Sequence, residues 1–125
     1  MKSEVLFDTN VVIDFLRGTD AAISLLQLLQ APPAVCAVTV TEIFAGLKNR
    51  KEERNAEAFF ADTQVFPLGS EIAQRAGVFV RLYGGSHGID IPDALIAATA
   101  EHHGLKLATL NTKHFPMLPK LKRAY

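Results

Sequence analysis

This sequence has almost no cysteine, no long apolar run and no excess of either charge. Its single cysteine, Cys36, cannot form an intramolecular disulfide, and its apolar neighbours indicate a small side chain buried in a strand. No stretch approaches the ~20 apolar residues that a membrane span requires. Only three apolar residues lie between Glu4 and Asp8, too few for the core of a signal peptide. We therefore expect a soluble, cytoplasmic protein with no membrane partner.

The charge balance excludes a general polycationic surface for nucleic acid. The chain has 13 basic and 13 acidic residues, and its pI is near 6.9. Contact with nucleic acid would therefore require a local patch. Two candidate patches exist, and ordinary solvated charge is the alternative interpretation of each: Lys48, Arg50, Lys51 and Arg54; and Lys113, Lys120, Lys122 and Arg123.

Several familiar site signatures are also missing. The chain has no Cys/His spacing for zinc, no Walker-type phosphate loop and no nucleophile elbow. A receiver-type signalling domain needs a phosphoacceptor Asp at the end of its third strand, but the nearby Asp62 precedes that strand. A haloacid-dehalogenase-like phosphatase opens with Asp-x-Asp, whereas this chain has Asp8-Thr9-Asn10. These classes of function are therefore excluded.

The sequence does contain enough apolar residues for a core, arranged in an alternating pattern. With 125 residues, 49% of them hydrophobic, we expect one domain over residues 1–125. Strand and helix signals alternate, which predicts an α/β fold with a mainly parallel sheet. Strands are expected at 4–7, 34–38, 65–66 and 106–110, with an edge strand in 116–125. Helices are expected at 11–17, 21–30, from 39 onward, and at 56–61, 71–83 and 93–103.

Three carboxylates, Asp8, Glu42 and Asp93, lie where an expected strand gives way to a helix or where a helix begins. The carboxyl ends of parallel strands meet at one edge of a sheet, where ligands bind at the point of reversed strand order. Three carboxylates gathered there would repel one another unless a cation neutralised them. The pattern therefore indicates a site for a hard divalent metal and phosphate chemistry.

Each acid also has a purely structural interpretation, and spacing alone leaves both open. Glu42 could form a capping box with Thr39, Asp8 could cap the first helix, and Asp93 could complement a helix dipole. Asp14 is expected to be a solvated surface charge. Asp90, three residues before Asp93, is a candidate auxiliary metal ligand.

At these residues the chain resembles the PIN-domain ribonucleases, and most closely the VapC toxins of bacterial toxin–antitoxin pairs. Four segments carry the resemblance: 6–13 (LFDTNVVI), 41–47 (TEIFAGL), 91–100 (IPDALIAATA) and 109–115 (TLNTKHF). The resemblance implies a three-layer α/β/α sandwich around a mainly parallel sheet of four to five strands. It also implies cleavage of RNA phosphodiester bonds that depends on Mg²⁺, with Mn²⁺ as a substitute.

The resemblance also implies roles for single residues. Asp8 and Asp93 would bind the metal directly, and Glu42 would bind it through water or activate the attacking water. Thr9 and Asn10 would orient Asp8 or contact the scissile phosphate.

The chain departs from the family at one position. Asn111 stands where many relatives have an Asp, and His114 follows three residues later. We expect both to contact substrate, and a second metal to bind weakly or only with RNA. Asn111 also favours the main alternative, a PIN domain without catalysis that binds RNA or protein.

The expected partners are RNA, a VapB-like antitoxin received by the first helices, and a second copy of the chain in a homodimer. The leucines of the second helix offer more apolar surface than one face against a core requires. They are Leu25, Leu26, Leu28 and Leu29. Messenger RNA, a transfer-RNA stem-loop and a ribosomal loop all stay open as the substrate.

Overall fold

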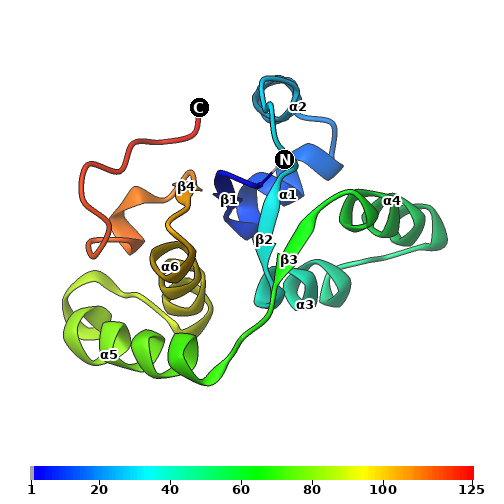
Figure 1. Ribbon diagram of the computed structural model, residues 1–125. Coiled ribbons are helices and arrows are strands. Elements are labelled where there is room, and N and C mark those ends of the chain that lie inside the picture. Colours follow the sequence, from blue (N-terminus) through cyan, green and yellow to red (C-terminus); the bar gives the residue numbers. More distant parts are fainter. Residues whose placement is uncertain (1) are drawn as a thin grey trace.

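The computed structural model describes residues 2–125 and has a four-stranded, fully parallel sheet at its centre (Figure 1). Its strands are β1 (Val5–Phe7), β2 (Ala34–Cys36), β3 (Gln64–Phe66) and β4 (Lys106–Ala108), in the order β3-β2-β1-β4. The chain therefore adds β2 and then β3 on one side of β1, and it returns to place β4 on the other side. The order reverses between β1 and β4, which is where open parallel sheets form ligand sites.

Helices cover both faces of this sheet, so the predicted three-layer α/β/α fold is confirmed. Helices α5 (Ser70–His87) and α6 (Ile91–His103) pack on one face. The other face carries α1 (Thr9–Leu16), α2 (Asp20–Gln27) and α4 (Arg50–Ala61), while α3 (Ala37–Ala45) contributes side chains to both layers. A short 3₁₀ helix, Thr112–His114, follows β4.

Alternation along the strands divides the core into two clusters. Leu6 and Cys36 face α5 and α6, whereas Phe7 and Val35 face the opposite layer. All four side chains are at most 1% exposed. Cys36 is the buried free thiol that its neighbours predicted, and burial raises its pKa.

The polar run before residue 56 is helical, contrary to expectation. The Asn49 side chain accepts a hydrogen bond from the Glu52 N–H (2.9 Å), and Glu52 Oε1 accepts one from the Lys48 N–H (2.9 Å). The first bond satisfies a backbone donor that a helix end otherwise leaves unpaired, and the second holds the residue before the cap. Helix α4 therefore begins at Arg50, and its polar first turn is exposed to solvent.

Helix α5 also runs further than expected, through Gly84 and Gly85 to His87. A glycine inside a helix costs only about 1 kcal/mol, so these residues need not end it. The helix ends at Gly88 instead, where φ is 64°. A side chain strains this left-handed conformation and glycine does not.

Residues 116–125 form no strand, so the expected edge strand is wrong. The segment crosses the β4 edge of the sheet instead of pairing along it. Its early side chains pack with the α5–α6 layer, and Ala124 and Tyr125 pack with the α1 layer. No helix within residues 2–125 combines the length and apolarity that crossing a membrane would require.

Candidate active site

Asp8 lies directly after β1, at the point where the strand order reverses. Its Oδ1 caps α1 by accepting a hydrogen bond from the Thr9 N–H (2.8 Å). Its Oδ2 accepts a hydrogen bond from the hydroxyl of Thr109 (2.6 Å), the residue that follows β4. Asp8 is 6% exposed. The two neighbouring strand ends are therefore joined through one buried carboxylate, which is both a helix cap and a member of the candidate site.

Glu42 reaches the same region from the second turn of α3. Its Oε1 accepts a hydrogen bond from the Thr9 hydroxyl (2.7 Å). Because that proton points to Glu42, the buried Thr39 hydroxyl, 2.9 Å from Thr9 Oγ1, acts as donor to Thr9. Helix α3 begins at Ala37, so Thr39 is not its cap and the proposed capping box with Glu42 is wrong.

Asp93 occupies the first turn of α6. Asp90 caps this helix, its Oδ1 accepting the Asp93 N–H (3.0 Å). Asp93 Oδ2 lies 3.1 Å from Nδ1 of His114, and the Asn111 side-chain amide lies 2.9 Å from the same ring nitrogen. The structure therefore brings together Asp93, His114 and Asn111, which the sequence placed in two separate motifs.

Burial and mutual repulsion disfavour the charged forms of two carboxylates in this site. Burial raises the pKa of Asp8, and the negative charge of Glu42 adds to the effect, while hydrogen bonds from Thr109 and Thr9 oppose it. Burial, then a hydrogen bond with Asp90 and the charges of Asp90 and Asp8, raises the pKa of Asp93 to about 6. His114 opposes both shifts. A bound cation would relieve this strain on both groups.

The donors suit Mg²⁺ or Mn²⁺ chemically, because they are hard oxygens. Within residues 2–125, no three His, Cys, Asp or Glu side chains form a ready-made metal cluster. Mg²⁺ commonly uses one or two carboxylates and completes its shell with water and substrate phosphate. Two residues after Asp8, the Asn10 Oδ1 is buried and accepts no hydrogen bond from the described chain. The residues therefore fit a metal held largely through water.

The raised pKa of Asp93 predicts how the metal-free chain responds to pH. Between its ordinary pKa and about 6, folded Asp93 holds a proton that the unfolded chain has released, so acidification stabilises the fold. In EDTA we expect Asp93→Asn to be more stable than the parent at about pH 7.5, because it lacks the disfavoured charge, and the difference to shrink toward about pH 5. Thermal unfolding measures this. A difference that stays constant with pH, as expected for the exposed control Asp20→Asn, would contradict the raised pKa.

Two of the predicted residues, Asp14 and Asp90, make contacts that the sequence did not predict. The sequence also missed Thr109, a residue that orients the Asp8 carboxylate. Asp14 is not a free surface charge, since its Oδ2 accepts a hydrogen bond from the Tyr125 hydroxyl (2.5 Å). Asp90 is exposed and caps α6. Thr109 was not singled out from the sequence. The sequence could have indicated it, because a hydroxyl side chain directly after an apolar strand is expected to be buried. A buried hydroxyl needs a hydrogen-bond partner.

A cavity of about 220 Å³ adjoins Glu42, between α1, α3 and α4. Apolar side chains of α1 and α3 line it together with Arg17, Lys48 and Asn55.

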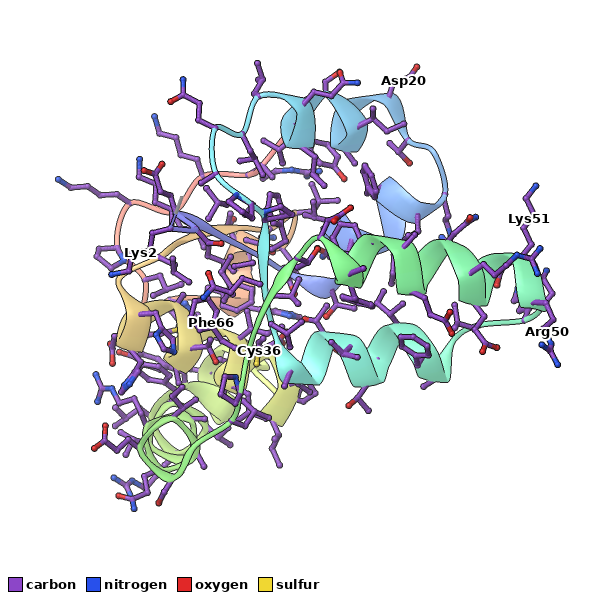
Figure 2. All side chains as sticks on the ribbon, turned by 45° about the vertical axis from the view of Figure 1, so that its right-hand side comes forward. Lys2, Asp20, Cys36, Arg50, Lys51 and Phe66 are labelled. Carbon is purple, nitrogen blue, oxygen red and sulfur yellow. The ribbon has the colours of Figure 1, made fainter. Side chains whose placement is uncertain are left out.

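The two basic patches lie on different parts of the chain. In the first, Arg50 and Lys51 project from the end of α4 near this cavity, away from the sheet (Figure 2). In the second basic patch, Lys113 lies in the 3₁₀ helix between Asn111 and His114. Lys48 of the first patch therefore lines the same cavity as Glu42, and Lys113 of the second patch adjoins His114, which contacts Asp93.

Comparison with known proteins agrees with this geometry. The PIN domain matches residues 5–121. Ribonuclease VapC10 of Mycobacterium tuberculosis is 40% identical over 121 residues, which cover 94% of this chain and 90% of that protein. Ribonuclease VapC19 of the same organism is 39% identical over 124 residues, which cover 96% of this chain and 98% of that protein.

Two solved structures share this fold over most of the chain. A toxin–antitoxin complex from Klebsiella pneumoniae matches with a TM-score of 0.84 at 30% identity, covering 98% of each chain. FitAcB from Neisseria gonorrhoeae matches with a TM-score of 0.72 at 29% identity, covering 89% of this chain and 90% of that one. The family match, the two sequence relatives and the shared fold lead to one conclusion: this chain belongs to the PIN-domain family, in its VapC group.

Proposed function

We propose that this chain is a metal-dependent endoribonuclease and the toxin of a toxin–antitoxin pair. The observation that carries the proposal is the interacting set of Asp8, Glu42 and Asp93 at the reversal of strand order. Burial and the neighbouring negative charges raise the pKa of Asp8 and of Asp93 in this set. The reaction is supported by relatives that are about 40% identical and are named ribonucleases.

In the proposed mechanism, Asp8 and Asp93 would hold Mg²⁺ or Mn²⁺. When bound there, such an ion would supply a lowered pKa for a coordinated water and would offset negative charge that develops on the phosphate. Thr109 and the Thr9 N–H hold the Asp8 carboxylate in one orientation. The Thr9 hydroxyl occupies Oε1 of Glu42, so Oε2 accepts the proton of the attacking water, or binds the ion through water.

Asn111 and His114 are proposed to contact the RNA phosphate beside Asp93. His114 is 37% exposed at its side chain, so it reaches solvent while keeping its contact with Asp93. Asn111 provides an oxygen without a charge. We therefore expect one ion to bind each chain in the absence of RNA. Calorimetric titration with Mn²⁺ tests this, and two equivalent sites would contradict it.

The proposal is tested by following cleavage of single-stranded RNA by the purified chain. Cleavage should require Mg²⁺ or Mn²⁺, stop in EDTA and return when the metal is restored, because the carboxylates cannot activate water alone. Cleavage in EDTA would contradict the metal requirement. Binding of RNA without cleavage under any of these conditions would favour the alternative, a PIN domain that binds without catalysis, for which Asn111 is the observation.

We propose that the cavity between α1, α3 and α4 receives part of a VapB-like antitoxin. The cavity adjoins Glu42, so a partner seated there would also block the active site. The similar Klebsiella pneumoniae structure is a toxin–antitoxin complex. Replacing the lining residue Leu47 with Arg should weaken antitoxin binding and free the nuclease from inhibition. Unchanged inhibition would place the antitoxin elsewhere.

A homodimer is also proposed, although the four leucines in and just after α2 support it less than expected. Leu25, Leu26 and Leu29 pack with the chain's own core, and only Leu28, 80% exposed, is left as free apolar surface among the four. Sedimentation that shows a strict monomer at high concentration would contradict the dimer.

A further inference from the structure

The last two residues of the sequence return to the helix that Asp8 caps. The Tyr125 hydroxyl donates a hydrogen bond to Oδ2 of Asp14, on α1, across 111 positions of the sequence. Burial and the bond to Asp14 raise the pKa of Tyr125 to about 12, so the hydroxyl keeps the proton that it donates. Both side chains are half-buried, and Tyr125 packs with the apolar cluster beneath α1.

The neighbouring residue connects the same segment to the active site. The Ala124 N–H donates a hydrogen bond to the carbonyl oxygen of Thr109 (2.9 Å). The hydroxyl of Thr109 donates to Oδ2 of Asp8 (2.6 Å) and accepts from the Asn111 N–H (3.0 Å). Thr109 is fully buried. The backbone of Thr109 is therefore held by Ala124, while its side chain orients the Asp8 carboxylate and the start of the turn that carries Asn111 and His114.

These contacts form a closed loop. Asp8 and Asp14 are held six positions apart on one helix and its cap, and Ala124 and Tyr125 are adjacent in the chain. The bond from Tyr125 to Asp14 closes the loop at one end, and the bond from Thr109 to Asp8 closes it at the other. The segment before Ala124 packs on the opposite layer, so residues 124 and 125 are joined to the α1 layer by this loop and by their own apolar packing.

We propose that Asp14 and Tyr125 are positioning residues, whose hydrogen bond holds Thr109 against Asp8 and thereby orients the catalytic carboxylate. This inference rests on the proposed function, because it assumes that Asp8 acts in cleavage. Neither residue touches the carboxylates of the site. Their effect passes through Ala124 and Thr109, and carboxylate orientation matters because a ligand or catalytic group displaced by a fraction of an ångström loses its productive geometry.

The test is removal of one hydroxyl group by Tyr125→Phe. We expect kcat to fall roughly 10-fold with KM unchanged, less than the ~100-fold that misplacement by a full ångström can cost. Asp14→Ala should give the same loss, and the double variant should be no worse than either single variant, because one bond is removed in each case. Asp14→Asn keeps an oxygen acceptor and should retain most of kcat. The matched control is Tyr83→Phe, which removes the hydroxyl of the other tyrosine in the sequence, on α5.

A second readout does not depend on cleavage. Amide hydrogen exchange at Asn111 and Ala124 reports whether Thr109 is held, because both N–H groups donate to it. Tyr125→Phe should speed exchange at both amides several-fold, and Tyr83→Phe should leave them unchanged.

The outcomes separate this inference from the proposed function. A parent chain that does not cut RNA would refute the proposed function, while exchange at Asn111 would still decide whether the hydrogen bond between Tyr125 and Asp14 positions Thr109. A Tyr125→Phe variant with unchanged kcat and unchanged exchange at Asn111 overturns the inference. A variant that only unfolds at lower temperature, with both readouts unchanged below that temperature, shows a purely structural bond and overturns it too.

Discussion

Replacing Asp8 with asparagine is expected to abolish metal-dependent RNA cleavage while leaving the chain folded. Asn is as good a helix cap as Asp, so α1 keeps its N-terminus. The substitution leaves one acceptor oxygen in place of two, but it also removes a buried carboxylate whose pKa is already raised. These effects oppose each other, so the metal-free chain should stay folded. Loss of the metal's contribution, about 4 kcal/mol or more, corresponds to a drop in kcat/KM of about 1000-fold or more.

The measurement is cleavage of single-stranded RNA with Mg²⁺, together with the Mn²⁺ affinity of the free protein. The matched control is Asp20→Asn, which removes the same charge from an exposed position at the start of α2 (Figure 2). It should cleave as the parent does. If Asp8→Asn cleaved within a few-fold of the parent, Asp8 would not be the central metal ligand.

The second large effect is expected for Glu42→Gln. Gln keeps an oxygen that can accept the Thr9 hydroxyl proton, so the side chain should stay in place and only its charge and basicity are lost. If Glu42 takes the proton of the attacking water, kcat should fall by about 10²- to 10⁴-fold. The Mn²⁺ affinity should stay close to that of the parent, because Asp8 and Asp93 are unchanged.

This variant distinguishes the two roles that Glu42 could have. Loss of Mn²⁺ affinity as severe as in Asp8→Asn would make Glu42 a direct ligand, whereas an unchanged kcat would remove it from the mechanism. Glu57→Gln, on the exposed face of α4, is the charge-matched control and should change neither quantity.

Tertiary contacts also changed the interpretation of residues that the sequence had singled out. Asp8 caps α1 and also lies in the candidate site, so its structural interpretation does not exclude the functional one that we propose. For Glu42, the capping box failed because α3 begins earlier than Thr39 suggested. Local spacing could not distinguish these cases, since the partner that orients Glu42 is Thr9, 33 positions away.

The sequence by itself determined most of the elements and the candidate acids. Alternating apolar segments predicted the four strands of a mainly parallel sheet and most of its helices, and the strand ends predicted where Asp8 would lie, because such patterns depend on neighbours a few positions apart. Tertiary structure alone decided which hydroxyls hold the carboxylates, where the segment 116–125 goes, and that Asp14 has a partner. Those outcomes depend on contacts between residues 101 and 111 positions apart, and only the packing of the sheet and its helices brings such residues together.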